Sequence, residues 1–432
     1  MKRTSRIIIT AGCAVLLFIT WIVTISSESS LDRQRALIVQ AAEKIDDGVY
    51  ILAVPLLEQA AGYNTAQTII AEEKLKQAYL ALMDNWGFRR RYTELLDRQM
   101  SRRDAPPDVF AEAANYYFSI SRITQALTVL KNGIEATGCE ELIALYESNR
   151  YAYETIRTSY EYIAAIHGVT MQVQREGLWG IARLDGTTLI PCMYEKISTF
   201  SDGTAIVMSS GEIFAVDGNN NRIALHRGGA TDIGNLSDNR IALNIDGIWR
   251  RASGSFALGT AGFERIGTYS GGFAAARLNG SWGVVDVGTD WLISPEYDAI
   301  IVDELGRCYG QGAVFVRNGS SVYLYADGRR VGGVFEDARP FSNEGYAAVM
   351  QNGKWGFIDT DGILRIDFAF DDALSFGQHL AAVRIGEHWG YICINGQIVI
   401  EPIFLEAKSF SDASAPVRTE RGWQIIRLLE YK

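Results

Sequence analysis

The stretch Gly353-Lys354-Trp355-Gly356-Phe357-Ile358-Asp359-Thr360-Asp361-Gly362 decides the fold, because close copies of it recur through the C-terminal half of the chain. Segments 177–186 and 319–328 align with it without a gap. Looser copies lie at 211–218, 247–254, 280–288 and 386–396, with a last fragment around Trp423. The tryptophan slot falls at Trp179, Ile213, Trp249, Trp282, Ser321, Trp355, Trp389 and Trp423, at intervals of 33 to 39 residues. Periods of this size are typical of a repeat architecture.

Each repeat is predicted to contain two or three short strands. In the copy around Trp355, residues 346–351 alternate as a strand, Asn352-Gly353 forms a tight turn, and residues 354–359 return as a second strand. Asp361-Gly362 then turns into a third strand near 363–368. Because successive side chains of a strand point to opposite faces, Trp355 lies on one face and Gly356 on the other. The glycine allows a neighbouring layer to approach closely.

Two further elements recur between the Trp-Gly segments. The first is an Ile-x-Pro-x-aromatic-acid pattern, found at Ile190, Pro191, Tyr194, Glu195; at Ile293, Pro295, Tyr297, Asp298; and at Ile400, Pro402, Phe404, Glu406. Proline lacks the ladder donor, so it indicates a strand end or edge. The second is an aromatic-serine turn, found at Phe200-Ser201, Tyr269-Ser270, Phe341-Ser342 and Phe410-Ser411. We expect that turn to close each unit.

These residues resemble the bacterial WG-repeat family, named for its Trp-Gly pair, from about Val169 to the C-terminus. Intact pairs occur at Trp179-Gly180, Trp282-Gly283, Trp355-Gly356 and Trp389-Gly390. Three slots depart from the pattern, at Ile213-Phe214, Trp249-Arg250 and Ser321-Val322, so packing or blade shape is in doubt there. The resemblance implies a β-stranded array used mostly for binding, and it transfers no catalytic residues.

The repeat count predicts an all-β domain over residues 168–432, with seven full units and a partial eighth. A closed propeller hides its strand edges by radial repetition, whereas the alternative, an open β-solenoid, needs caps. We favour the propeller, because the unit number lies in the propeller range. The repeat-defining residues are interpreted as structural and not as ligand contacts: Trp179, Gly180, Trp249, Trp282, Gly283, Trp355, Gly356, Trp389, Gly390 and Trp423.

Residues 1–27 are predicted to contain a cytoplasmic tip and a transmembrane signal anchor. Residues 7–25 form an uncharged run of 19 residues, preceded by Lys2, Arg3 and Arg6. A helix of this length spans about 28 Å, close to the hydrocarbon thickness of a bilayer. The positive-inside bias then places the N-terminus in the cytoplasm and the bulk of this single-pass membrane protein outside. A cleaved signal peptide is the alternative, but no small-residue cleavage site stands out.

Residues 28–167 are predicted to be helical, because apolar residues recur there at spacings of three and four. Ala41, Gly48, Tyr50, Ala53, Leu57 and Ala60 fall at offsets that resemble the tetratricopeptide helix pair, and Ala114, Tyr117, Ala126, Leu130 and Gly133 repeat most of them. Pro106-Pro107 separates two helices. We expect a short α-solenoid, with an irregular helical stalk as the alternative. A last helix is expected over 141–165, and its tyrosines are interpreted as packing residues.

The sequence shows no catalytic or metal-site signature. The net charge of −10 argues against a nucleic-acid platform. The histidines His167, His226, His379 and His388 have no metal-site spacing around them, and nucleophile-elbow and phosphate-loop motifs are absent. Asp359-Thr360-Asp361-Gly362 is interpreted as a turn and not as a calcium loop, because Ile363 and Leu364 follow it. The cysteines after Cys13 are expected to be buried free thiols.

These observations predict a binding protein without catalysis or cofactors. Its partner is expected to be a protein or a cell-envelope glycan, bound through the repeat surfaces of a membrane-anchored, extracytoplasmic scaffold. The alternative function is a cell-envelope hydrolase or lyase that uses loop carboxylates of the β domain. Loop acids gathered around a deep cleft, with raised pKa values, would favour that alternative.

Overall fold

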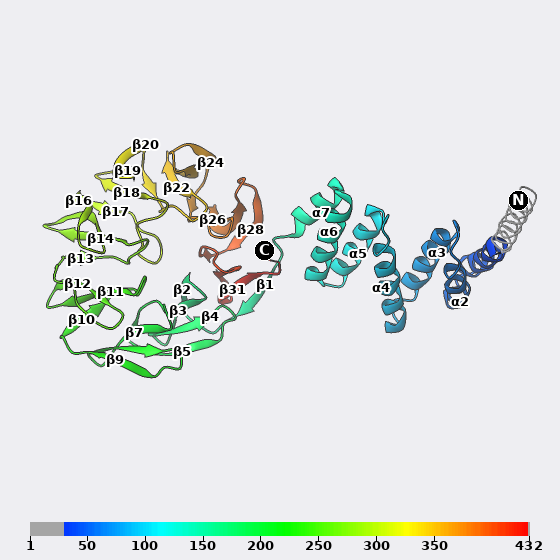
Figure 1. The fold of residues 1–432 in the computed structure, drawn as a ribbon, viewed down its shortest axis with the longest axis horizontal. Coiled ribbons are helices and arrows are strands. Elements are labelled where there is room, and N and C mark those ends of the chain that lie inside the picture. Colours follow the sequence, from blue (N-terminus) through cyan, green and yellow to red (C-terminus); the bar gives the residue numbers. More distant parts are fainter. Residues whose placement is uncertain (1–29, 431–432) are drawn as a thin grey trace, which may run out of the picture. The chain divides into compact units, whose positions relative to one another are not determined.

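The computed structural model describes residues 30–430, which form two compact units that divide between Glu147 and Ser148 (Figure 1). The first unit is helical and the second is built from strands. Within residues 30–430, every helix is too short or too polar to cross a membrane. The predicted anchor at residues 7–25 lies outside the described residues.

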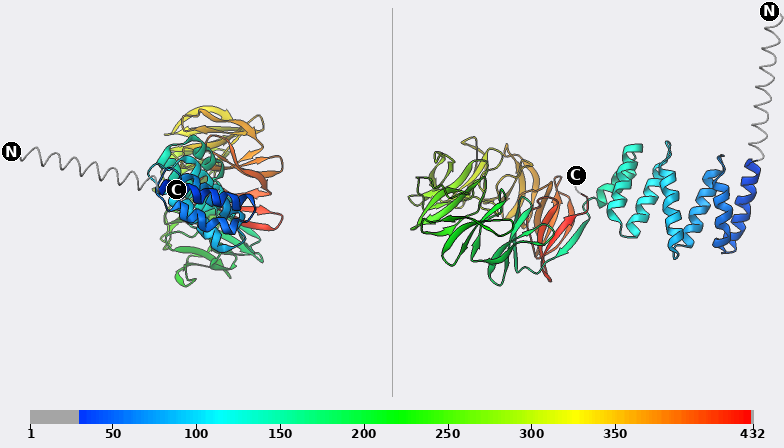
Figure 2. Two further views of the ribbon diagram at one scale, coloured as in Figure 1. Left: turned by 90° about the vertical axis from the view of Figure 1, so that its right-hand side faces the viewer. Right: turned by 60° about the horizontal axis from the view of Figure 1, so that its bottom comes forward.

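The first unit is a row of helices in which each helix contacts the next (Figure 2). A helix over residues 30–46 is followed by α2 (Tyr50–Ala61), α3 (Thr68–Ala81), α4 (Trp86–Met100), α5 (Pro107–Ser119), α6 (Ile123–Thr137) and α7 (Glu140–Asn149). Small residues lie where helices cross: Ala53 is fully buried, and an added Cβ on Gly133 would lie 2.7 Å from Phe110. Pro107 begins α5, where a missing N–H costs nothing. The tetratricopeptide-like character of the unit stays a prediction.

The prediction of one helix over residues 141–165 is wrong. Helix α7 ends at Asn149, and two strands follow it, β1 (Tyr153–Arg157) and β2 (Tyr162–His167). Strand β1 pairs with β31 at the other end of the unit, and this long-range pairing overrides the local apolar pattern. Strand β2 forms a hairpin with the next strand, β3. The boundary between the units therefore lies before β1, whereas the sequence predicted a boundary between residues 167 and 168.

Residues 148–430 form eight sheets, which are the blades of a β-propeller (Figure 1). Blade 1 contains β2, β3 (Thr170–Arg175), β4 (Leu178–Arg183) and β5 (Thr188–Tyr194); blade 2 contains β6 (Lys196–Ile197), β7 (Thr204–Ser209), β8 (Glu212–Asp217) and β9 (Arg222–His226). Blade 3 contains β10 (Ala230–Ile233), β11 (Arg240–Ile245) and β12 (Ile248–Ser253); blade 4 contains β13 (Arg265–Ile266), β14 (Phe273–Leu278), β15 (Ser281–Asp286) and β16 (Trp291–Tyr297). Blade 5 contains β17 (Ala299–Ile300), β18 (Ala313–Asn318), β19 (Ser321–Ala326) and β20 (Arg329–Phe335); blade 6 contains β21 (Asp337–Ala338), β22 (Tyr346–Gln351), β23 (Lys354–Asp359) and β24 (Leu364–Phe370). Blade 7 contains β25 (Asp372–Ala373), β26 (Leu380–Ile385), β27 (His388–Cys393) and β28 (Ile398–Phe404); blade 8 contains β29 (Glu406–Ala407), β30 (Ser414–Thr419), β31 (Gly422–Leu428) and β1.

The ring closes in blade 8, where the first strand of the unit completes the last sheet. Strand β1 pairs antiparallel with β31, from Tyr153 opposite Leu428 to Arg157 opposite Gln424. Next to this pairing, the Thr158 hydroxyl donates a hydrogen bond of 2.7 Å to the carbonyl of Trp423. The unit predicted to be a partial eighth is thus a full blade. The closed propeller is confirmed, and the open solenoid is wrong.

The Trp-Gly pair marks a bulge between the third and fourth strands of a blade. In blade 6, Trp355 pairs with Phe370 and Phe357 pairs with Ile366, so β24 carries two extra residues opposite Gly356. An added Cβ on Gly356 would lie 2.6 Å from the carbonyl oxygen of Ile366. The same test at Gly180, Gly283 and Gly390 gives 2.5, 2.3 and 2.5 Å to the carbonyl oxygens of Ile190, Ile293 and Ile400. Glycine is therefore required wherever this bulge occurs.

The slots without an intact pair have a different fourth strand. Phe214 and Tyr323 pair directly with Leu225 and Val334, with no bulge at that residue. In blade 3, Trp249 forms an isolated bridge with Phe263 in place of a full fourth strand. These differences explain why larger residues are tolerated in the glycine slot of these blades.

One slot of the repeat alignment needs a correction. The sequence placed the tryptophan slot of blade 5 at Ser321. However, Arg317 pairs with Val322 as Arg277 pairs with Trp282 in blade 4, so Val322 occupies the slot. The misplacement arose because blade 5 has no tryptophan to fix the alignment.

We predict that Gly356→Ala lowers the free energy of unfolding by about 1–3 kcal/mol, the usual cost of forcing extra volume into a packed site. Gly333→Ala is the matched control, because Gly333 lies in β20 with nothing within 4 Å of an added Cβ. That variant should unfold within about 0.5 kcal/mol of the wild type. Urea unfolding monitored by circular dichroism measures both. Equal stability of the two variants would contradict the role assigned to the bulge.

Candidate functional site

A polar cavity of about 360 Å³ lies between the loops that join the first and second strands of several blades. The aromatic-serine turns belong to these loops. Phe341 and Phe410 are 7% and 3% exposed and pack into the blades, whereas Ser342 and Ser411, next to them in sequence, line the cavity. The motif that was predicted to close each unit thus also places hydroxyl groups around this cavity. We call it the axial cavity.

A second cavity, of about 650 Å³, lies beside blades 1, 2 and 8. It shares His167 and Gly168 with the axial cavity, and it includes Phe200 and Ser201 from the aromatic-serine turn of blade 2.

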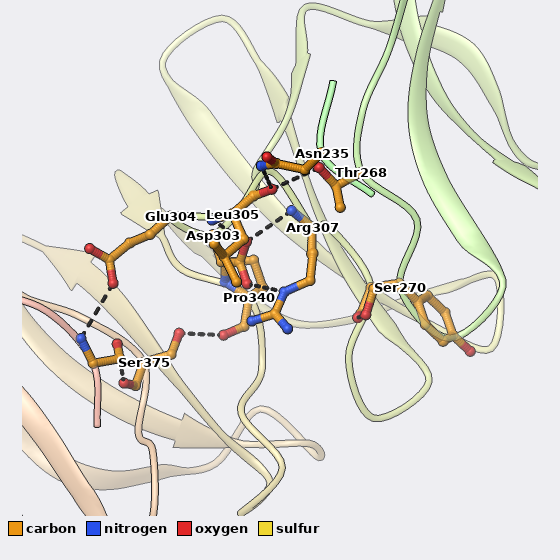
Figure 3. A network of polar contacts seen from close by, with 11 residues as sticks. Asn235, Thr268, Ser270, Asp303, Glu304, Leu305, Arg307, Pro340 and Ser375 are labelled. Carbon is orange, nitrogen blue, oxygen red and sulfur yellow. Dashed lines mark hydrogen bonds and ion pairs between the residues drawn. The ribbon is translucent and has the colours of Figure 1, made fainter. Parts of the chain in front are cut away.

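One loop of the axial cavity is longer than the others. We call residues 301–312, between β17 and β18, the axial loop; the equivalent loops of blades 4 and 7 span only 267–272 and 374–379. Figure 3 shows this loop and its polar contacts with other blades. Its residues Glu304 and Leu305 bond to blades 8, 3 and 4, so the loop reaches across the centre of the ring.

The Leu305 carbonyl is held by two blades on one side of the centre (Figure 3). It accepts hydrogen bonds from Asn235 Nδ2 at 3.1 Å and from the Thr268 hydroxyl at 2.7 Å. Asn235 is itself oriented, because its Oδ1 accepts from Gln172 Nε2 at 3.2 Å and from the Thr199 N–H at 3.3 Å. The axial loop is therefore tied to blades 1 to 4.

The Glu304 carboxylate ties the same loop to blade 8. Its Oε1 lies 3.1 Å from Lys408 Nζ, and its Oε2 accepts from the Ser409 N–H at 3.4 Å. Burial lowers the pKa of Lys408, but Glu304 and neighbouring groups raise it more, so the net pKa lies above its ordinary value of 10.5. The lysine is therefore fully charged at neutral pH.

Hydroxyl groups continue this network through the remaining blades. Ser409 Oγ donates to the Ser375 carbonyl at 3.2 Å, and Ser375 Oγ donates to the Pro340 carbonyl at 2.6 Å. These bonds join blades 8, 7 and 6 around the cavity (Figure 3). Because these hydrogen bonds link loops of different blades, they hold the cavity walls in one arrangement before a ligand binds.

The repeat-defining tryptophans are separate from the axial cavity, each within its own blade. Trp355, Trp249 and Trp423 are 3%, 5% and 4% exposed, and Trp179, Trp282 and Trp389 are partly buried. Arg339 and Arg265 lie over the rings of Trp355 and Trp249, at 4.3 and 4.9 Å. The glycines Gly180, Gly283, Gly356 and Gly390 face the bulges described above. The structural role of these residues stays a prediction.

The recurring acids hold hairpin turns. Asp371 Oδ2 accepts from the Gly386 N–H at 2.7 Å, and Glu336 accepts from the N–H groups of Asn352 and Gly353 at 2.8 and 2.9 Å. Equivalent bonds of Glu161, Glu195, Glu264 and Asp298 hold the turns of four other blades. The hydrogen bond from Lys354, and then that from Gly386, lowers the pKa of Asp371. This is opposite in direction to the raised pKa expected of a carboxyl acid catalyst.

The other candidate groups of the sequence also have local partners. Asp359 Oδ1 accepts from the N–H groups of Asp361 and Ile363 at 3.0 and 2.9 Å, so the acidic segment is a capped turn. Within residues 30–430, no three His, Cys, Asp or Glu side chains lie together as a metal site. Cys139, Cys192, Cys308 and Cys393 are free; Cys13 lies outside the described residues. His167 lines the axial cavity, and burial lowers its pKa.

The sequence patterns did not predict a functional role for the axial loop. The sequence does carry a sign of this loop, because the interval between Trp282 and Ser321 is the widest between successive tryptophan slots. The additional residues of that interval form the axial loop.

We predict that Glu304→Gln destabilises the propeller by about 2 kcal/mol. This cost lies between the costs of breaking an exposed and a fully buried ion pair, because the side chains of Glu304 and Lys408 are each about one-fifth exposed. Glu406→Gln, which breaks the more exposed pair with Arg418, should cost less than about 1 kcal/mol. Urea unfolding at pH 7 compares the two. The difference should start to shrink as the pH passes the ordinary lysine value of 10.5 and should disappear only above the raised pKa of Lys408 in the folded protein. An equal effect at pH 7 would contradict the assignment.

Comparisons with known proteins agree with the repeat architecture. The family model described as "WG containing repeat" matches residues 179–211, 333–355, 355–387 and 389–423. A search of curated proteins found no match.

Similar solved structures share little sequence with this chain. One titled "Crystal structure of the eukaryotic initiation factor" is 11% identical, covers 59% of this chain and 79% of its own, and has a TM-score of 0.40. The AfRom2 CNH domain is 8% identical over 65% and 100% of the two chains, with a TM-score of 0.35. The Neurospora crassa Pan2 WD40 domain is 9% identical over 63% and 90%, with a TM-score of 0.34. Scores this low support no conclusion. The family matches show that the chain contains WG repeats.

Proposed function

We propose that this WG-repeat protein is a non-catalytic binding scaffold, and that its axial cavity recognises part of a protein or of a cell-envelope glycan. The observation that carries the proposal is the preorganised polar cavity at the centre of a closed ring. Its volume of about 360 Å³ falls within the range of small-ligand sites. The recurring acids hold turns, which supports binding over the hydrolase or lyase alternative.

The helical unit offers a second surface for the same scaffold. Its successive helices and fully buried alanines suit a tetratricopeptide-like solenoid, a class of repeat that presents extended binding surfaces. We further propose that residues 7–25 anchor the chain in the membrane, with both units outside the cytoplasm. Protease treatment of intact cells checks this placement, since digestion of the propeller without lysis is expected and full protection would contradict it.

The binding proposal is tested by capture from envelope extracts with the immobilised fragment 28–432. Ser411→Trp should fill the axial cavity, which Ser411 lines. The matched control is Glu420→Trp, on an exposed hairpin turn between β30 and β31 that is remote from the cavity lining. We expect reproducible capture of one partner by the wild type and by Glu420→Trp, and at least tenfold weaker capture by Ser411→Trp.

Two results would contradict the proposal. Capture of no partner by the wild-type fragment would count against a scaffold function. Equal capture by the two tryptophan variants would place the binding surface away from the axial cavity. Thermal unfolding of each variant confirms that the fold is retained.

A further inference from the structure

The acids that line the axial cavity are engaged in holding its walls. Asp303 accepts hydrogen bonds from the N–H groups of Leu305 and Arg307, each at 2.9 Å, and from Arg307 Nε at 2.7 Å. Glu304 is paired with Lys408, and Glu344 Oε1 accepts from the His379 N–H at 3.1 Å. Most of the strong acceptors are therefore used by the fold.

Several donors of the same cavity, by contrast, have no partner. Arg307 uses only its Nε for Asp303, which leaves two terminal nitrogens without a hydrogen bond to the described residues, and its side chain is 38% exposed. Ser342 is 7% exposed, and its buried hydroxyl has no hydrogen-bond partner. Gln378 uses Oε1 for the Ala413 N–H and keeps its amide NH₂ unpaired. The cavity thus presents unpaired donors to whatever enters it.

We propose that the axial cavity binds an acidic saccharide of one or two rings, with the carboxylate on Arg307 and ring hydroxyls on Ser342 and Gln378. This inference rests on the proposed binding function and names the ligand class of the same site. The terminal nitrogens of a guanidinium are suited to a carboxylate, because they offer two parallel donors. A buried serine hydroxyl without a partner is costly in the free protein, and a ligand hydroxyl satisfies it.

The lining favours a saccharide over the carboxylate end of a peptide. Of the aromatic residues that line the cavity, Phe341, Phe376 and Phe410 are 7%, 4% and 3% exposed, so these rings offer little apolar surface to a peptide side chain. The fourth, Tyr309, is partly exposed and carries a hydroxyl group. The lining instead includes the hydroxyl-bearing residues Ser342 and Ser411. Such a surface suits a ligand covered with hydroxyl groups.

Titration calorimetry of the full chain with galacturonic acid and digalacturonic acid tests the proposal, with galactose as the neutral probe. We expect binding of at least one acid and at least tenfold weaker binding of galactose. Arg307→Gln should weaken binding of the acid by about tenfold or more, the effect of a lost charged hydrogen bond.

Ser342→Ala keeps the test valid if Arg307→Gln disturbs the axial loop. Removal of an unpaired buried hydroxyl should leave the melting temperature unchanged or higher, while affinity falls by about three- to tenfold. Ser414→Ala is the matched control, because its hydroxyl is also buried without a partner but lies outside the axial cavity. That variant should bind the acid as the wild type does.

The proposal would be overturned by galactose binding as tightly as the acids, by an unchanged affinity in Ser342→Ala, or by displacement of the acid by trialanine, which would indicate a peptide site. Failure of both acids to bind also overturns it. If capture of a partner still depends on Ser411, that failure leaves the scaffold function intact. If capture is lost as well, the proposed function fails with it.

Discussion

Five residue pairs between β1 and β31 join the start of the propeller to its last blade. Without them β31 would leave an open strand edge, which invites pairing with other chains. The contact is distant in sequence, since the hydrogen bond from Thr158 to Trp423 spans 265 residues. Loop-closure entropy grows only logarithmically with length, by about 0.6 kcal/mol for each doubling, so the ladder of β1 and β31 can offset it. The arrangement of the blades around one centre depends on this closure.

The axial cavity depends on the same closure, because its walls come from loops of blades that only a closed ring brings together. The axial loop spans this ring, with the Leu305 carbonyl bonded to blades 3 and 4 and the Glu304 carboxylate bonded to blade 8. Strain or opening at one blade is therefore transmitted to the centre. The arrangement gives a cavity with engaged acids and unpaired donors, which supports the proposed binding function.

The fold could be predicted largely because the Trp-Gly pair reports a local constraint. A glycine is needed at position 356 because the bulged backbone of β24 lies too close for a Cβ atom. The Trp-Gly pair therefore recurs wherever a blade has that bulge. The pattern gives no information where the constraint is absent, which is why the slot of blade 5 was placed at Ser321 and not at Val322. The strand character of residues 153–157 was also missed, because it depends on a partner at the other end of the unit. The axial cavity has the same origin: Asn235, Thr268 and Lys408 are far apart in sequence, and only ring closure makes them neighbours of one loop.

Hydrogen–deuterium exchange of the full chain tests the closure most directly, because amides bonded between strands exchange only when the blade opens. The account predicts that the backbone amides of β1 that bond to β31 are protected to the same degree as those of β30 and β31, and that the axial loop amides of Leu305 and Arg307 share this protection. Exchange of residues 153–157 at the rate of an unpaired segment, while β30 and β31 stay protected, would contradict the closed ring.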